Sequence, residues 1–484
     1  MTLKLLALEC LPVIGGILLL VFGARRFAAE INIAFSALTF IVAVVIAMDV
    51  LTDGDQTVLN DLFVLDSFNI FLISLTALVG LTTAIYSRPY MRIEVERGTL
   101  TPLRLRLYHG MFQFFMFTML LALATNSLGL LWVAMEAATL TTVLLVSLYR
   151  TPSSVEAAWK YFILCGVGLA LALFGTILLY FAAEKVLGAG GGALLWTKLA
   201  VVKDELEPTV LSLAFVFLLV GYGTKVGLAP LHNWLPDAHA EGPTPVSAVL
   251  SGLLLNVALY AVVRSKVLVD GALGHGFAGN LMMGFGLLSI VVAAFSLQRQ
   301  KDVKRLFSYS SVEHMGLMAF AFGMGGATAT FAGLLHMTVH SLTKSAIFFA
   351  VGHAVQKVGS QAIDDIRGLI NVSPQVGWAL MLGGLAILGM PPFGVFTSEF
   401  LILTQAMAHH PWATPFLVIG LGVAFASILG RLQLMVFGES TAKPLSFRPT
   451  AVPVFVHLAL ALLLGLYIPP FLAEWYRQAA RLIG

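Results

Sequence analysis

The segment LSLAFVFLLVGYGTKVGLAPLHNWLPDAH (residues 211–239) decides the fold class of this chain. Residues 211–224 carry no charge, Lys225 follows them, and a Gly-Leu-Ala-Pro break comes directly after it. A charge near the bilayer centre costs roughly 2.5–3.5 kcal/mol on insertion scales. A broken helix is tolerated at that depth only where its backbone lines a cavity or is covered by protein. The segment therefore predicts a membrane helix that belongs to a path for an ion or proton.

The composition supports the same class. The chain has 484 residues, of which 59% are hydrophobic and only 11% charged, whereas soluble domains average about 25% charged residues. No basic cluster is interleaved with aromatic residues, so the sequence offers no support for nucleic-acid binding. We therefore expect a polytopic membrane protein that contacts the lipid bilayer.

Counting about 20 apolar residues per bilayer crossing gives fourteen predicted spans and an all-α fold. They cover 3–22, 29–50, 63–87, 107–125, 127–149, 155–183, 209–230, 244–265, 277–297, 302–324, 328–356, 374–408, 412–437 and 449–472. We expect one integral membrane domain (1–484) with four parts. These are the first three spans (1–106), two repeats (107–270 and 271–440), and a last span with its tail (441–484).

A second broken helix supports the division into repeats. In GMPPFGVFTSEFLIL (389–403), Pro391, Pro392 and Gly394 interrupt the twelfth span, as Pro230 ends the seventh. Transporters built from inverted repeats place paired broken helices at matching positions in their two halves. Spans four to eight and nine to thirteen are therefore predicted to be inverted five-helix repeats.

The basic residues predict the orientation. Loops after odd-numbered spans carry 17 Lys and Arg residues, Lys443 and Arg448 among them, and the opposite face carries 8, including Arg264 and Lys266. By the positive-inside rule both termini are extracytoplasmic. We expect a multi-pass protein of a bacterial or archaeal inner membrane.

The small number of cysteines limits the redox chemistry that this chain could carry out. Cys10 and Cys165 both lie in apolar segments, and an iron–sulfur cluster normally needs about four thiolates. We therefore expect no disulfide, no cofactor in this chain, and no redox chemistry of its own.

Glu136 lies near the middle of the fifth span and is a candidate partner for a buried lysine. Opposite charges within about 4–6 Å stabilise each other's ionised form, so a pair that closes and opens would switch the proton affinity of the lysine. The alternative is a protonated Glu136 bonded to a neighbouring helix. Lys160 lies about one turn inside the sixth span and is either a relay between Glu136 and Lys225 or a lysine that snorkels to the headgroups.

The stretch HMTVHSLTK places His336, His340 and Lys344 on one helix face. At about 1.5 Å rise per residue they cover about 12 Å, and one water between neighbours would connect them. A metal shared by the two histidines is the rival reading. A haem held by His340 and His353 is another, although no second histidine pair faces them.

Other polar residues extend this line. Glu399 follows the second break and either ends the line or is a helix-start carboxylate held by backbone amides. His232 follows Lys225 and continues the path. Glu313 and His314 lie inside the tenth span and add to the line. We expect solvated loop positions at the cytoplasmic mouth for three further residues, Asp237, His239 and Glu241. Three others lie at the cytoplasmic end of the tenth span and are expected to anchor it: Asp302, Lys304 and Arg305.

Several of these segments resemble the antiporter-like subunits of the complex I superfamily, which includes group 4 hydrogenases and multi-subunit cation/proton antiporters. The resemblance rests on WVAMEAATL (132–140), GTKVGLAPLHNWLPDAHAEGPTPVSA (223–248), QKDVKRLFSYSSVEHMGL (300–317) and GMPPFGVFTSEFLIL (389–403). The motifs EHMGL and LLNVALYAVVR look most like the hydrogenase-4 component F group. The chain ends about a dozen residues after the last predicted span, so we expect no long lateral helix of the distal complex I type.

The resemblance implies roles for single residues. Glu136 and Lys225 match the family's switching pair, and His336, His340, Lys344 and Glu399 match later positions of its central polar line. Asn256 departs from the pattern, since many members carry Lys or His there and an amide does not titrate.

The resemblance implies a proton-translocating subunit of a redox-driven complex of the hydrogenase-4 or formate hydrogenlyase type. Its partners would be other membrane subunits and a peripheral hydrogenase-like arm, which would hold the Fe–S clusters and the Ni–Fe site. The alternatives are a subunit of a complex I-type quinone oxidoreductase, a multi-subunit Na⁺/H⁺ antiporter, and a scaffold that moves nothing, which Asn256 alone favours.

Overall fold

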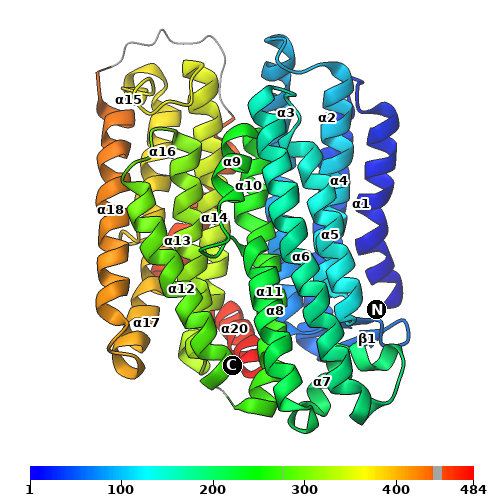
Figure 1. The fold of residues 1–484 in the computed structure, drawn as a ribbon. Helices are drawn as coiled ribbons and strands as arrows, with labels where there is room; N and C mark the ends of the chain where they lie inside the picture. Colours follow the sequence, from blue (N-terminus) through cyan, green and yellow to red (C-terminus); the bar gives the residue numbers. More distant parts are fainter. Residues whose placement is uncertain (275, 440–449) are drawn as a thin grey trace.

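The computed structural model describes residues 1–274, 276–439 and 450–484. Long helices run side by side in one bundle, and Figure 1 shows the N- and C-termini at the same end of it. That placement is what an even number of crossings requires. The described residues exclude Lys443 and Arg448, so these two basic residues and the start of the predicted part 441–484 lie outside them.

Twelve long helices form the body of the bundle. They are α1 (Thr2–Phe22), α2 (Ala28–Asp53), α3 (Ser67–Glu96), α4 (Pro102–Ala124), α5 (Leu128–Val146), α6 (Pro152–Leu187), α8 (Pro208–Val226), α11 (Leu255–Leu273), α12 (Gly276–Leu297), α13 (Val303–Met324), α14 (Ala327–Val358) and α18 (Thr414–Phe437). The shorter ones are η1 (Gly191–Leu194), α7 (Trp196–Val201), η2 (Lys203–Glu205), α9 (Trp234–Glu241), α10 (Thr244–Val249), η3 (Leu250–Leu254), α15 (Leu369–Val372), α16 (Pro374–Ile387), α17 (Gly394–His409), α19 (Val452–Leu466) and α20 (Pro470–Ile483).

Eleven helices of the described chain are long and apolar enough to cross a membrane, or twelve if α19 and α20 count as one bent span. Each of the fourteen predicted spans has a helical counterpart. However, α13 carries several charged residues, and α16 and α17 are short halves of one broken segment. The polytopic all-α class is therefore confirmed, and the count of fourteen stays a prediction.

The helix starts follow from local sequence. Asp66 caps α3 by accepting from the amides of Phe68 and Asn69, both at 3.0 Å. Thr101 and Thr151 cap α4 and α6, each with proline at the first helical position, the combination that favours a helix start. Glu207 caps α8, and the amides of Val210 and Thr209 that bond its carboxylate lower the pKa of Glu207.

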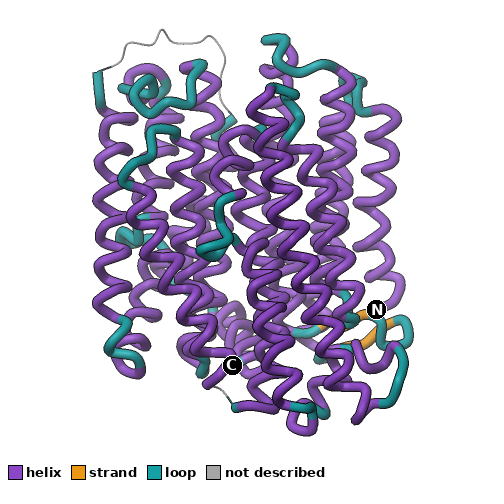
Figure 2. Tube along the Cα trace, in the orientation of Figure 1, coloured by secondary structure: helices purple, strands orange, loops and turns teal. Residues whose placement is uncertain are grey.

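The predicted break after Lys225 is present, but the residues that follow are more ordered than expected. α8 ends at Gly227, whose φ of 82° lies in the left-handed region that favours glycine. Trp234–Glu241 then forms the short helix α9, whereas we expected Asp237, His239 and Glu241 to lie in a loop. Pro236 is accommodated because it lies in the first turn, where its missing N–H has no helical partner. Figure 2 shows the loop between α8 and α9 part-way along the bundle rather than at either end of it.

Two further expectations are corrected. A two-stranded hairpin, β1 (Gln56–Val58) with β2 (Phe63–Leu65), precedes α3, so the predicted third span begins too early. The predicted eighth span ends too early: Arg264 and Lys266 are buried in α11 rather than exposed in a loop.

Arg264 remains buried because its charge is compensated. It forms an ion pair with Asp66, both side chains being 2% exposed. Its guanidinium also lies over the rings of Trp196 (4.2 Å) and Tyr260 (5.0 Å). A buried charge is tolerated when it is paired and hydrogen-bonded in this way. The pair fixes α11 to the start of α3.

The helices divide into a core and a shell. In α14, and in the continuous segment from Thr244 to Leu273, every residue of the most apolar 18-residue window is buried. In α2 and α18 only a third of the corresponding window is buried. The outer helices thus provide the lipid-facing surface, and α14 and α11 lie inside protein.

The end of the chain turns back into the bundle. α20 is bent by 80° from α19 and packs against α3 and α14. Its Trp475 indole donates to the Ser67 carbonyl at 2.7 Å, and the Tyr476 hydroxyl lies 2.6 Å from that of Thr338. The sequence predicted only a tail after the last span; the structure folds that tail into α20, whose Trp475 and Tyr476 are buried.

The proposed repeats have the same order of neighbours. α4, α5, α6 and α8 pack in succession, with α11 against α8. In the second half α12, α13, α14 and the α16–α17 pair pack in succession, with α18 against α16. This order is what two related halves require, and the inverted relation between them stays a prediction.

Candidate functional site

Lys225 lies at the last turn of α8, completely buried. Its ammonium donates to the Thr139 hydroxyl at 2.7 Å and to the Tyr161 hydroxyl at 2.5 Å. It also lies 4.5 Å from the centre of the Tyr161 ring and 6.0 Å from that of Trp234. Neutral oxygen atoms and aromatic faces therefore hold the lysine, and no carboxylate is bonded to it.

Glu136 is on α5, one turn before Thr139. It is near enough to Lys225 for electrostatic attraction. Within the described residues it forms no ion pair, and its Oε2 is buried without a hydrogen-bond partner. Because positions three apart lie on the same helix face, Thr139 and Glu136 present two alternative partners to one ammonium. The structure shows the arrangement in which the predicted pair is open.

Lys160 is placed away from this centre. Its side chain is 49% exposed and pairs with Glu156 at 2.7 Å and Asp237 at 3.3 Å. Asp237 also pairs with Arg305 at 2.7 Å. The structure thus brings Lys160 to a peripheral charge cluster joining α6, α9 and α13, and gives it no contact with Glu136 or Lys225. This geometry fits the snorkelling reading rather than the relay.

The residues after the first break are more buried than expected. His232 is 6% exposed, has an unpartnered Nδ1, and lies against Tyr309 with ring centres 6.0 Å apart. His239 was expected in a solvated loop, but it is fully buried in α9 and stacks on Phe348 at 4.9 Å. The cause is that α9 folds into the bundle. Lys304 anchors the end of that helix by donating to the carbonyls of Ala240 (2.8 Å) and Gly242 (2.6 Å).

Asn256 occupies the middle of the site. Its amide donates to the Ser341 hydroxyl of α14 at 2.8 Å, while its Oδ1 is buried and has no partner. It follows η3, a π-helical turn that inserts one residue into the helical repeat. Asn256 therefore fixes α11 to α14 and keeps one free acceptor inside the protein.

Lys344 begins the second half of the polar line. It is fully buried on α14, and its ammonium donates to the Phe307 carbonyl of α13 at 2.8 Å. Glu313, 3% exposed on α13, is close enough to attract it electrostatically. The pair resembles Lys225 and Glu136 in that a buried lysine is bonded to a neutral oxygen with a carboxylate nearby.

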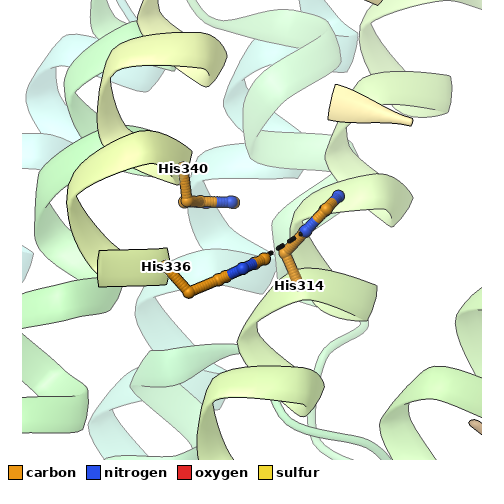
Figure 3. Close-up of side chains that lie close together, drawn as sticks. All are labelled: His314, His336 and His340. Carbon is orange, nitrogen blue, oxygen red and sulfur yellow. Dashed lines mark hydrogen bonds between the residues drawn. The ribbon is translucent and has the colours of Figure 1, made fainter. Parts of the chain in front are cut away.

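Three histidines lie together beyond Lys344. Figure 3 shows His336 and His340 on one helix, α14, facing His314 of α13. His314 Nδ1 and His336 Nε2 share a hydrogen bond at 2.9 Å, and His336 Nδ1 is 2.8 Å from the Ser398 hydroxyl of α17. Both ring nitrogens of His340 are buried without a partner. A hydrogen-bonded chain thus runs from α13 through α14 to α17.

The three imidazoles also offer ligand atoms within 4.8 Å of one another. Zinc binds imidazole nitrogen at about 2.0–2.1 Å, so two ligands of one tetrahedral ion lie roughly 3.4 Å apart. Here His314 Nδ1 and His336 Nε2 are 2.9 Å apart and share a hydrogen bond, so a proton lies between them where a metal ion would otherwise bind. The donors suit a metal chemically, but their spacing is that of a hydrogen-bonded relay.

Glu399 ends the line, one residue after Ser398 on α17. Its Oε1 lies 3.9 Å from His314 Nδ1, and the residue is 9% exposed. Gly389, in the second break, packs against it: a Cβ there would lie 1.9 Å from Glu399 Oε2. Pro391 and Pro392 follow, so Glu399 packs directly against the second break.

Sequence reasoning missed the partners of these groups. Thr139, Tyr161 and Ser398 are ordinary polar residues in apolar spans, and nothing in their spacing marks them. His314 carried a signal, because it adjoins Glu313 inside a span. The hydrogen bond between His314 and His336 depends on how α13 and α14 pack, which one sequence does not reveal.

Comparison with known proteins places these features in a family. A family model described as NADH:quinone oxidoreductase/Mrp antiporter, TM, matches residues 125–425. That range contains every residue of the site, from Glu136 to Glu399.

Two relatives cover more of the chain. A hydrogenase-4 component F homolog of Methylacidiphilum infernorum (isolate V4) is 48% identical over 472 residues, which are 98% of each chain. NADH-quinone oxidoreductase subunit N of Desulforudis audaxviator (strain MP104C) is 30% identical over 337 residues, 69% of this chain and 64% of that protein.

Solved structures share the fold. A chain of the membrane-bound sulfane sulfur reductase, an archaeal respiratory membrane complex, has a TM-score of 0.89 at 25% identity and covers 100% of this chain and 98% of its own. A chain of the Mrp complex from Dietzia sp. DQ12-45-1b gives 0.87 at 19% identity, with 100% and 98% covered. Both neighbours are chains of larger complexes. The chain is an antiporter-like, multi-pass membrane subunit and belongs to the NADH:quinone oxidoreductase/Mrp antiporter family.

Proposed function

We propose that this chain moves protons across the membrane as the antiporter-like subunit of a hydrogenase-type redox complex. The observation that carries the proposal is the buried line of titratable groups across the centre of the bundle. Glu136, Lys225 and His232 form its first half, and the second half comprises Lys344, His340, His336 and Glu399. Nearly all are shielded from solvent. Buried ionisable groups are costly, and within a membrane they mark proton or ion paths.

The chemistry at Lys225 follows from its two sets of partners. In the open arrangement, Thr139 and Tyr161 stabilise the ammonium by hydrogen bonds but supply no negative charge. A rotamer change toward Glu136 would add a full opposite charge and strengthen proton binding. Alternation between these partners makes Lys225 release a proton in one position and bind it in the other.

The two halves meet at Asn256, which accepts and donates hydrogen bonds but does not titrate. Its free Oδ1 can accept from a water or a protonated donor. A proton therefore crosses this point along a water held between Asn256 and the groups on α14. Lys160 takes no part, because its side chain is exposed and bonded to carboxylates.

At the far end the path leaves through the histidines. The His314–His336–Ser398 chain provides neighbouring donors and acceptors at 2.9 and 2.8 Å. A proton entering one imidazole nitrogen displaces another from the opposite nitrogen, so a chain of imidazoles passes protons without moving its heavy atoms far. Glu399 receives or delivers the proton at the second break.

The first test replaces Lys225. In vesicles containing the whole complex, Lys225→Ala abolishes redox-coupled proton movement, followed with a pH-sensitive dye, while electron transfer in the partner subunits persists. Lys185→Ala, which removes an exposed lysine at the end of α6, leaves proton movement unchanged. Undiminished pumping by Lys225→Ala would refute the proposal.

Metal removal separates the relay from its rival. A membrane-permeant chelator leaves the pumping rate of the wild-type complex unchanged if the three histidines pass protons. Loss of pumping on chelation, restored by zinc, would assign the histidines to a metal instead.

The name of the 48% identical relative favours a hydrogenase-type complex. We propose that a peripheral hydrogenase-like arm carries the Fe–S clusters and the Ni–Fe site. Purification of the native complex tests this: a hydrogenase large subunit supports it, and only small membrane subunits would indicate a cation/proton antiporter.

A further inference from the structure

A separate cavity lies at the end of the bundle where α1 and α3 finish and α2 and α4 begin, at the upper right of Figure 1. Its volume is about 580 Å³. Arginines and apolar side chains line it together, and none of them belongs to the buried polar line. The lining includes Arg25, Arg26, Arg88, Arg92 and His109.

Positive charge is in excess on this lining. Glu30 Oε1 accepts from Arg88 Nε at 2.8 Å and from Arg92 Nη2 at 2.9 Å, so two guanidiniums share one carboxylate. Glu96 is the only carboxylate among the described lining residues. Arg25 and Arg26 form no side-chain hydrogen bond or ion pair with any described residue. Two guanidiniums are thus available for an anion.

His109 provides an independent indication of a ligand. It is 2% exposed, lines the cavity from α4, and its Nδ1 is buried without a hydrogen-bond partner. Leaving a buried polar atom unpaired destabilises the folded state. A ligand oxygen inside the cavity would give this nitrogen a partner.

The surroundings of the cavity are apolar. Ala28, Met91 and Leu105 form part of its wall. Next to it, the side chains of Phe22 and Phe27 are 44% and 51% exposed on the outside of the bundle. A small soluble anion would use only the arginines, whereas a ligand with a charged head and hydrocarbon tails would use the whole surface.

We propose that this cavity binds the head group of an acidic phospholipid. The phosphate lies against Arg25 and Arg26, because guanidinium forms strong charge-assisted bonds with phosphate oxygen. A glycerol or ester oxygen meets His109, and the acyl chains follow the exposed phenylalanines. Basic pockets between membrane helices recognise anionic lipid head groups by this combination.

The test measures lipid binding by the complex purified in mild detergent. Native mass spectrometry counts bound phosphatidylglycerol or cardiolipin, against phosphatidylcholine and inorganic phosphate at equal concentration. Each basic residue near an anionic lipid surface strengthens binding about fivefold, so Arg25→Gln with Arg26→Gln weakens acidic-lipid binding roughly 30-fold. The matched control, Arg299→Gln with Lys301→Gln, removes two charges from an exposed loop between α12 and α13 and leaves binding unchanged.

A second variant distinguishes the histidine from the arginines. His109→Gln weakens binding but keeps its dependence on salt, since no charge is lost, whereas the double arginine variant flattens that dependence. Equal unfolding temperatures in phosphatidylcholine nanodiscs show that the variants fold. Equal lipid loss by the control, displacement by inorganic phosphate, or a partner protein cross-linked into the cavity would each overturn the proposal.

Discussion

At the scale of single residues, the hydroxyls around Lys225 are as important as its carboxylate partner. The ammonium is bonded to Thr139 and Tyr161 and not to Glu136. These bonds define a position in which the lysine forms no ion pair with Glu136. In the proposed switch, the open position is therefore fixed by hydrogen bonds and does not result from simple dissociation of the pair.

Removing one hydroxyl tests this view. Tyr161→Phe deletes a hydrogen bond to a charged group, worth about 1.5–3 kcal/mol, and biases Lys225 toward Glu136. We expect the proton-pumping rate in vesicles to fall at least about tenfold while the complex assembles normally. Tyr222→Phe serves as the control, because Tyr222 is a buried tyrosine on α8, the helix of Lys225, and its hydroxyl is not bonded to that lysine. Equal rates for the two variants would contradict the assigned role.

The second break depends on a glycine. Gly389 has φ of 63°, and a Cβ at this position would lie 1.9 Å from Glu399 Oε2. Gly389→Ala combines left-handed strain with a displaced carboxylate, and we expect a loss of stability of about 1–3 kcal/mol together with slower pumping. Thermal unfolding of the purified complex measures the first effect. Gly422→Ala is the control, since nothing lies within 4 Å of its added Cβ; the same loss there would refute the packing argument.

At the scale of elements, the short helix α9 shows what could be predicted and what could not. The break after Lys225 follows from Gly227 and Pro230, whose backbone preferences are local. The helix from Trp234 and the burial of His239 depend on neighbours in α13 and α14. One sequence shows the residue types but not which helices meet, so Ser398 and the contacts of His314 also escaped prediction. Arg264 was assigned to a loop because its partner Asp66 lies 198 residues away.

Lys304 is the anchor on which α9 depends. Its ammonium satisfies two carbonyls at the end of that helix, where the helix dipole also favours a positive charge. Lys304→Met leaves these carbonyls unpaired, and we expect about 2–3 kcal/mol of destabilisation with faster hydrogen exchange in residues 234–242. Lys301→Met changes an exposed lysine three positions away. Similar exchange in both variants would show that α9 is held by packing alone.

At the scale of the whole molecule, the charge asymmetry predicts the orientation. The cavity lined by arginines lies at the end of the bundle opposite the two termini in Figure 1. The positive-inside rule predicts that this end faces the cytoplasm. This assignment rests on the sequence alone, because the rule compares the numbers of Lys and Arg in the loops and does not depend on how the helices pack.

Labelling of single cysteines checks the orientation. In a background with Cys10→Ser and Cys165→Ser, we expect Thr99→Cys to react with a membrane-impermeant maleimide only after cells are opened. Asp53→Cys, at the opposite end of the bundle, reacts in intact cells. Both positions are exposed, so access depends on the side of the membrane. The reverse pattern would place the termini in the cytoplasm.

The burial of α14 has a wider consequence. Its most apolar 18-residue window has the lowest mean hydropathy of the eleven apolar helices, 1.2 where three reach 2.5, and yet every residue of that window is buried inside protein. The environment of this helix is other protein, formed by the outer helices around it. The free energy of transferring a side chain from water to lipid therefore does not decide which residues it can carry. Because surrounding helices replace lipid as the environment of α14, this helix can carry imidazole and ammonium groups at a depth where exposure to lipid would be too costly.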